Sequence, residues 1–206
     1  DSAHWGCDEK SLSPPPSLLK WLVRNFDQGQ KPGGSSKTAC LRQKLSDRDP
    51  DTVQRALSSI DQENRPDSAW YILEGMSYPD VFIQTRSAIV VIEGKRTEPK
   101  PTQSTRWMPM RDQLLRHIDC VWDIRHDRHV FGFMVVEGEN TTGKVPEAWL
   151  DWYRELRQPS ILCRSLPHRS PKERQDILRA VLGVTTWQQV CTKFGIPFED
   201  LPDVCR

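Results

Sequence analysis

Residues 79–95 read PDVFIQTRSAIVVIEGK, and this stretch decides the fold that we expect for the chain. Two runs of aromatic and β-branched residues, 81–83 and 88–92, lie on either side of a short turn at Arg86 and Ser87. Runs of this kind, separated by turn residues, are typical of β-strands. The stretch therefore predicts an antiparallel hairpin, with residues before the turn facing residues after it.

The predicted hairpin register brings two acidic residues together. A turn at 86–87 sets Asp80 directly opposite Glu93, and directly opposed side chains project to the same face with Cβ atoms roughly 4.5–5.5 Å apart. Two carboxylates at that distance repel each other unless a cation or a shared proton compensates. Because side chains alternate along a strand, Lys95 is expected on the same face as Glu93. A slip of one residue would separate the two carboxylates.

An acid pair beside an ammonium group predicts a specific chemistry. Carboxylate oxygens suit Mg²⁺, which keeps several waters for substrate phosphate and nucleophile, and Mn²⁺ is expected to substitute for it. Lys95 could steady the attacking hydroxide or the charge that develops on phosphoryl oxygens. We therefore expect Asp80 and Glu93 to bind a metal and the site to hydrolyse phosphodiester bonds.

Helices and further strands are predicted around this hairpin. Apolar residues at helical spacing, often after a proline, predict the helices, and short β-branched or aromatic runs predict the strands. The predicted helices cover 17–26, 37–45, 51–65, 110–122, 146–157, 171–182 and 186–194, and the predicted additional strands cover 70–73 and 129–136. The fold class expected from this order is α/β (α+β), with a mixed central sheet flanked by helices.

The same order divides the chain into three parts. Residues 51–136 form the expected core, and residues 1–50 form an amino-terminal helical extension that contains a flexible linker at 28–36. Residues 137–206 form a carboxy-terminal helical extension packed on the core.

The motif and the order of elements resemble a known family. Pro79-Asp80 followed by Glu93-Gly94-Lys95 is similar to the PD-(D/E)xK motif of restriction-endonuclease-like nucleases. The core of that fold runs helix, three antiparallel strands, helix, strand, which is the order read from about residue 51 to residue 136. Gln113, with His117 one turn later, resembles the Gln-x-x-x-Tyr signature of RecB-type and lambda-exonuclease-type members, although His stands in place of Tyr. The resemblance implies a catalytic role for Asp80, Glu93, Lys95 and Gln113.

Further residues are expected to serve such a site. An acid from the first helix often joins the metal ligands in this family, and Glu63 is the candidate, with Glu74 as a second. Two locally basic segments predict contacts with the phosphate backbone of nucleic acid. The candidate residues in these segments are Lys100, Arg106, Arg111, Arg164, Arg169 and Lys172.

Composition excludes some functions. The chain has 206 residues, with 29 basic and 28 acidic side chains and a formal net charge of +1, so it lacks the overall positive field of a histone-like protein. Its longest purely apolar run, 88–92, is far short of the roughly 20 residues of a membrane-spanning helix. The 6 cysteines show no Cys-x-x-Cys pair. We interpret them as reduced thiols and expect a cytoplasmic protein without a membrane partner.

Two functional hypotheses follow from the sequence. The first is a Mg²⁺-dependent nuclease acting on DNA, and the alternative is a catalytically silent module with the same fold that binds nucleic acid or acts in assembly. The sequence does not distinguish endonuclease from exonuclease or DNA from RNA. A homodimer would suit a double-strand cutter, but no residue pattern specifies one.

Overall fold

The structure is a computed structural model that describes residues 1–26, 37–62, 66, 69–98, 105, 108, 110–139 and 143–201. The linker predicted at 28–36 therefore lies outside the described residues. Within the described part of the chain, no helix combines the length and the apolar character that a membrane span would require. Five cysteines are described, and all five are free thiols.

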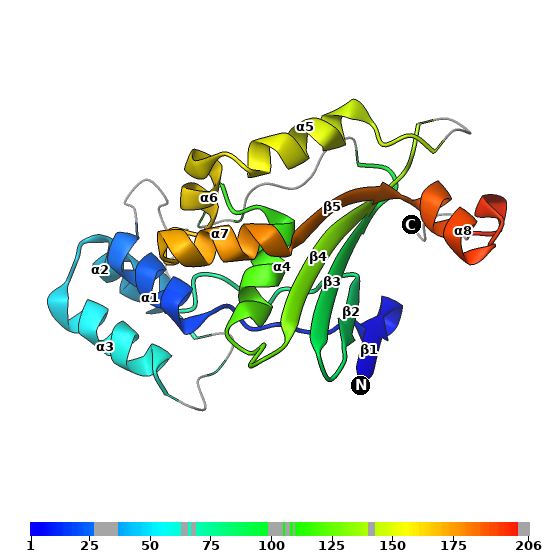
Figure 1. Cartoon of the computed structure of the whole chain (residues 1–206). Coiled ribbons are helices and arrows are strands. Elements are labelled where there is room, and N and C mark those ends of the chain that lie inside the picture. The colour runs from blue at the N-terminus through cyan, green and yellow to red at the C-terminus, as the bar shows by residue number, and fades with distance from the viewer. Residues whose placement is uncertain are drawn as a thin grey trace.

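The centre of the fold is a mixed sheet of five strands in the order β1-β2-β3-β4-β5 (Figure 1). β1 pairs antiparallel with β2, β2 pairs antiparallel with β3, and β3, β4 and β5 run parallel to one another. The strands are β1 (Ser2–Trp5), β2 (Val81–Gln84), β3 (Ala88–Lys95), β4 (His129–Val136) and β5 (Val181–Thr186). The chain is thus a mixed α/β protein whose sheet is flanked by helices, as the sequence predicted.

The hairpin register is confirmed. Val81 faces Ile92 and Ile83 faces Val90, and the Thr85 amide donates to the Ala88 carbonyl at 2.8 Å to close the turn. The register continued by one residue sets Asp80 across from Glu93. The strand expected at 129–136 is also present, parallel to β3.

Two predictions about strands are wrong. Residues 70–73 form no strand, and the edge position beside β2 is taken by β1 from the start of the chain. Residues 181–186 were expected to lie partly in a helix, but they form β5. The physical reason is tertiary: Tyr71, Ile72 and Leu73 are buried against helices, where their apolar surface is covered without strand pairing. The sheet therefore takes strands from outside the range 51–136 that was expected to form the core.

One face of the sheet is covered by helices, and a further helix packs on these. These are α4 (Gln113–Trp122), α5 (Glu147–Leu156), α6 (Pro159–Ser165) and α7 (Pro171–Ala180). Figure 1 shows α4 and α7 lying against the strands, with α5 and α6 beside them. Alternate strand residues such as Ile89, Val91 and Met134 pack with Ile118 of α4 in one continuous core. Burial of this face fixes the direction in which Glu93 points, because residues 89, 91 and 93 share it.

Three helices lie apart from the sheet and share a second core. These are α1 (Pro16–Asn25), α2 (Lys37–Ser46) and α3 (Pro50–Ile60), drawn in blue and cyan in Figure 1. Leu18, Leu22, Ala56 and Ile60 form the buried face of this cluster with the segment around Tyr71. α3 begins at Pro50 with Asp49 as its cap, because the Asp49 carboxylate accepts a bond from the Thr52 amide at 2.9 Å.

A last helix, α8 (Trp187–Phe194), follows β5 directly and leaves the carboxyl end of the sheet (Figure 1). Thr186 caps its start, and Gly195 ends it with a left-handed backbone conformation at φ 65°. α8 therefore begins near the end of β3 that carries Glu93 and Lys95.

Candidate functional site

The structure brings Asp80, Glu93 and Lys95 together at the carboxyl end of β3. Glu93 is only 2% exposed, and its Oε1 lies 2.8 Å from Nζ of Lys95. Asp80 precedes β2, and its Oδ2 accepts a hydrogen bond of 2.6 Å from the Gly94 amide. The two acids and the ammonium group predicted from the hairpin register thus form one cluster.

Helix α4 adds two side chains to this cluster, both of them on Glu93. Gln113 donates from Nε2 to Oε1 of Glu93 at 2.5 Å, and Nε2 of His117 lies 2.8 Å from Oε2. α4 is held at its start by Asp112, whose carboxylate accepts a bond of 3.0 Å from the Leu115 amide. Gln113 and His117 are four residues apart, so they lie on one face of the helix and reach the same carboxylate.

Ser77 extends the cluster and was not predicted. Its Oγ lies 2.7 Å from Nδ1 of His117, and its backbone forms a bridge with Leu12. A neutral imidazole that accepts from the Ser77 hydroxyl at Nδ1 carries its proton on Nε2, which can then donate to Glu93. The local sequence gives no signal for this role, because the bond joins residues 40 positions apart.

The electrostatics of the two acids differ. Burial and the nearby charge of Glu93 raise the pKa of Asp80 above its usual value. Burial also opposes ionisation of Glu93, but the hydrogen bonds from His117 and Lys95 and the positive charge of Lys95 outweigh it, so the pKa of Glu93 lies below its usual range. Glu93 in turn raises the pKa of Lys95, although burial alone would lower it. The site therefore holds an ionised Glu93 and a charged Lys95 beside a second carboxylate that resists ionisation.

The glycine between Glu93 and Lys95 is in close contact with α8. A Cβ placed on Gly94 would come 2.8 Å from Cζ2 of Trp187 and 3.5 Å from Oδ2 of Asp80. The absence of a side chain at this position lets the indole ring lie against the strand. Nε1 of Trp187 is buried and has no hydrogen-bond partner among the described residues.

The oxygen atoms of the cluster fit a hard divalent cation. Asp80 and Glu93 supply carboxylates, and the side-chain carbonyl oxygen of Gln113 is buried without a partner in the described structure. Mg²⁺ is commonly bound through one or two carboxylates, with waters completing its coordination. The described residues contain no group of three or more His, Cys, Asp or Glu side chains arranged to hold a metal. Any cation here would therefore depend on the two carboxylates, the Gln113 oxygen and solvent.

Two residues predicted to contact nucleic acid are buried instead. Arg111 is 1% exposed and is bonded to Glu74 at 3.2 Å and to Asp119 at 2.7 Å. Arg169 is 6% exposed and reaches Asp119 at 2.8 Å. Because a buried arginine needs carboxylate partners, these guanidinium groups stabilise the interior and do not reach a phosphate backbone. The prediction of a binding role is wrong for both residues.

The other predicted residues lie elsewhere. Arg164 and Lys172 are exposed on α6 and α7, and Arg164 donates to the Ser160 carbonyl of its own helix at 3.3 Å. Glu74, the second acid considered for the metal, is buried against Arg111. The remaining candidates, Glu63, Lys100 and Arg106, lie outside the described residues.

Comparisons with protein-family models, with curated proteins and with solved structures found no match to this chain.

Proposed function

We propose that this protein is a Mg²⁺-dependent nuclease that hydrolyses phosphodiester bonds of DNA. The observation that carries the proposal is the hairpin register, in which Val81 faces Ile92, together with the bond from the Gly94 amide to Asp80 and the ion pair of Glu93 with Lys95. These contacts gather two carboxylates and an ammonium group at one end of β3. Structural ion pairs are usually of opposite sign, whereas this pair is of like sign and raises the pKa of Asp80. Like charges kept together in this way are typical of sites that bind a cation or a proton.

Each residue of the cluster has a role in this proposal. Asp80 and Glu93 would hold the cation, which when bound polarises the phosphoryl oxygens and lowers the pKa of its water. Lys95 would stabilise the negative charge that builds up on the phosphoryl group. Gln113 and His117 orient the Glu93 carboxylate, because both bond directly to it. The resemblance to PD-(D/E)xK nucleases in residues 79–95 supports the same assignment.

A cleavage assay tests the proposal. Linear, circular and single-stranded DNA are incubated with the full chain and Mg²⁺, and Lys95→Ala is compared with Lys44→Ala, which removes an exposed lysine from α2. The proposal predicts Mg²⁺-dependent cleavage that Lys95→Ala abolishes and Lys44→Ala retains. Equal activity of wild type and Lys95→Ala would rule out the mechanism.

One observation favours a second function, a nucleic-acid-binding or assembly module without turnover. Both oxygens of Glu93 are already bonded within the protein, to Lys95, Gln113 and His117. Such a carboxylate has fewer lone pairs left for a cation. The two functions are separated by thermal unfolding, since Mg²⁺ or Mn²⁺ should raise the melting temperature of a metal-binding enzyme and leave that of a silent module unchanged.

A further inference from the structure

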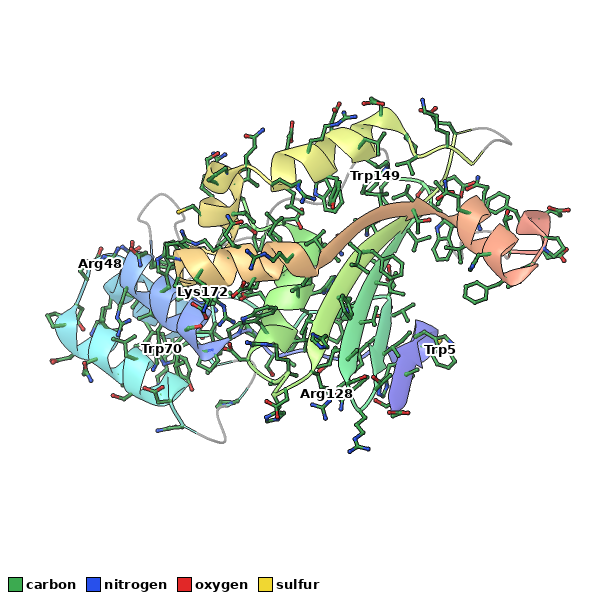
Figure 2. The ribbon with its side chains drawn as sticks, in the orientation of Figure 1. Trp5, Arg48, Trp70, Arg128, Trp149 and Lys172 are labelled. Atoms are coloured by element: carbon green, nitrogen blue, oxygen red, sulfur yellow. The ribbon has the colours of Figure 1, made fainter. Side chains whose placement is uncertain are left out.

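A pocket of about 370 Å³ lies at the end of the sheet opposite the group formed by Asp80, Glu93 and Lys95, which we call the acid cluster. It lies between the start of β4 and the carboxyl ends of α4 and α7, and its lining includes Trp122, Arg125, Arg128, Phe131 and Arg179. His129, also in the lining, pairs with Ala88 at the start of β3, whereas Lys95 is at the strand's other end. A strand of 8 residues spans roughly 23 Å, so the pocket is separate from the acid cluster. Figure 2 shows Arg128 at this end of the strands.

The pocket has an excess of positive charge. Three guanidinium groups line it, and Asp176 is the only acidic residue among its lining residues. The carboxyl ends of α4 and α7 add about half a negative charge each. A net positive charge remains, in a chain whose formal net charge is only +1. The pocket is therefore suited to an anion.

The arginines keep hydrogen-bond donors for a ligand. Arg179 is 77% exposed on its side chain and is bonded to Oδ1 of Asp176 through one nitrogen, at 2.7 Å. Arg128 donates from Nε to the Thr85 carbonyl at 3.1 Å and from Nη1 to the Arg125 carbonyl at 3.4 Å. A guanidinium has five N–H donors, so these bonds use only part of each group. The remaining donors match the oxygens of a phosphate.

Aromatic and apolar groups form another part of the same pocket. The guanidinium carbon of Arg125 lies 4.0 Å from the centroid of the Trp122 ring, and Phe131, Val130 and Ala180 complete the apolar wall. A planar base can pack against such a wall while its phosphate meets the arginines. We propose that this pocket binds a nucleotide through its phosphate, whether as a free nucleotide or as the terminal nucleotide of a strand. The proposal does not depend on the nuclease function.

Binding can be measured without divalent metal, which keeps the test independent of cleavage. Adenosine monophosphate, inorganic phosphate and a short single-stranded oligonucleotide with a 5′-phosphate are titrated into the full chain in the presence of a chelator, with calorimetric detection. The test variant is Arg179→Glu, because this residue is exposed and makes a single ion pair within the described part of the chain. The matched control is Arg154→Glu on α5, whose side chain is 61% exposed and also pairs with acids of its own helix.

We expect saturable binding that Arg179→Glu weakens about tenfold or more and Arg154→Glu leaves unchanged. Asp176→Asn should tighten binding, since it removes the acidic residue from the lining. If adenosine monophosphate binds, a free nucleotide is sufficient as the ligand of this pocket. If only the oligonucleotide binds, the ligand is the terminal nucleotide of a strand. No binding of any of the three probes, or equal affinity in wild type and Arg179→Glu, would overturn the proposal.

Discussion

Gly94 and Trp187 are packed so closely that a methyl group on the glycine would come 2.8 Å from Cζ2 of the indole ring. The amide of the same glycine donates to Asp80 at 2.6 Å. The packing of α8 on β3 and the orientation of the Asp80 carboxylate therefore meet at one residue. Asp80 and Lys95 therefore both depend on how the strand runs through this glycine.

Gly94→Ala should destabilise the protein and displace Asp80. Overpacking of this kind costs about 1–3 kcal/mol of unfolding free energy, because the ring or the strand must shift. Urea unfolding measures the effect. The control is Gly75→Ala, since a Cβ at Gly75 would meet nothing within 4 Å. Equal stability of the two variants would show that the ring moves aside without cost.

Asp80→Asn should stabilise the protein at neutral pH and abolish cleavage. Burial and Glu93 raise the pKa of Asp80, so its ionised form is less favourable in the folded chain than in the unfolded chain. This loss of folding stability is absent below about pH 3.9, which is the pKa of an aspartate in the unfolded chain. It grows as the pH rises above that value and is complete above the pKa of Asp80 in the folded chain. We expect the variant to melt a few degrees higher at neutral pH, with the difference vanishing below about pH 4. Mg²⁺ should stabilise wild type and not the variant.

Arg111→Met should destabilise the protein strongly. Its guanidinium is bonded to Glu74, Asp119 and the Ser165 carbonyl in the interior, so the change leaves two buried carboxylates with one cationic partner fewer. Breaking such a pair costs about 3–5 kcal/mol. Chemical denaturation provides the measurement, with exposed Arg154→Met expected to change stability by less than about 0.5 kcal/mol. A near-neutral result for Arg111→Met would mean that these carboxylates find other partners.

Ser77→Ala should destabilise the protein by about 1–3 kcal/mol and reduce activity less than Lys95→Ala does. The change removes the hydroxyl that lies 2.7 Å from Nδ1 of His117 and leaves that nitrogen buried and unpaired. His117 can then adopt the other tautomer, which cannot donate to Glu93. Thermal unfolding and cleavage rates are compared with Ser13→Ala, an exposed serine bonded only to the Met76 sulfur in the described structure. Equal melting temperatures and equal cleavage rates of the two variants would show that Ser77 has no role in the site.

The local part of the fold was predictable from sequence. The hairpin, its register and the helix that carries Gln113 follow from alternation and helical spacing, which are properties of neighbouring residues. For that reason the convergence of Asp80, Glu93 and Lys95 could be inferred from residues 79–95 alone. The order of strands in the whole sheet could not be inferred in this way. β1 is a short strand without an apolar run, and it pairs with β2, which lies far along the chain.

The same limit explains the errors at basic residues. Arg111 and Arg169 lie in segments rich in positive charge, and nothing close to them in sequence indicates burial. Their partner Asp119 lies 8 and 50 positions away, respectively, and brings them together only in three dimensions. Ser77 was missed for the same reason. A charged side chain can be assigned to the surface or the interior only when its counter-charge is known.

The charged interior also constrains how this sequence can change over evolution. Burial opposes ionisation of Asp119, but Arg111, His168 and Arg169 hold its pKa well below the usual range. Replacing one of these residues leaves its buried partners without a counter-charge. We therefore expect substitutions at these positions to occur together. Homologous chains should either keep Glu74, Arg111 and Asp119 together or replace all three by apolar residues. Covariation among these three positions would then identify chains that share this fold.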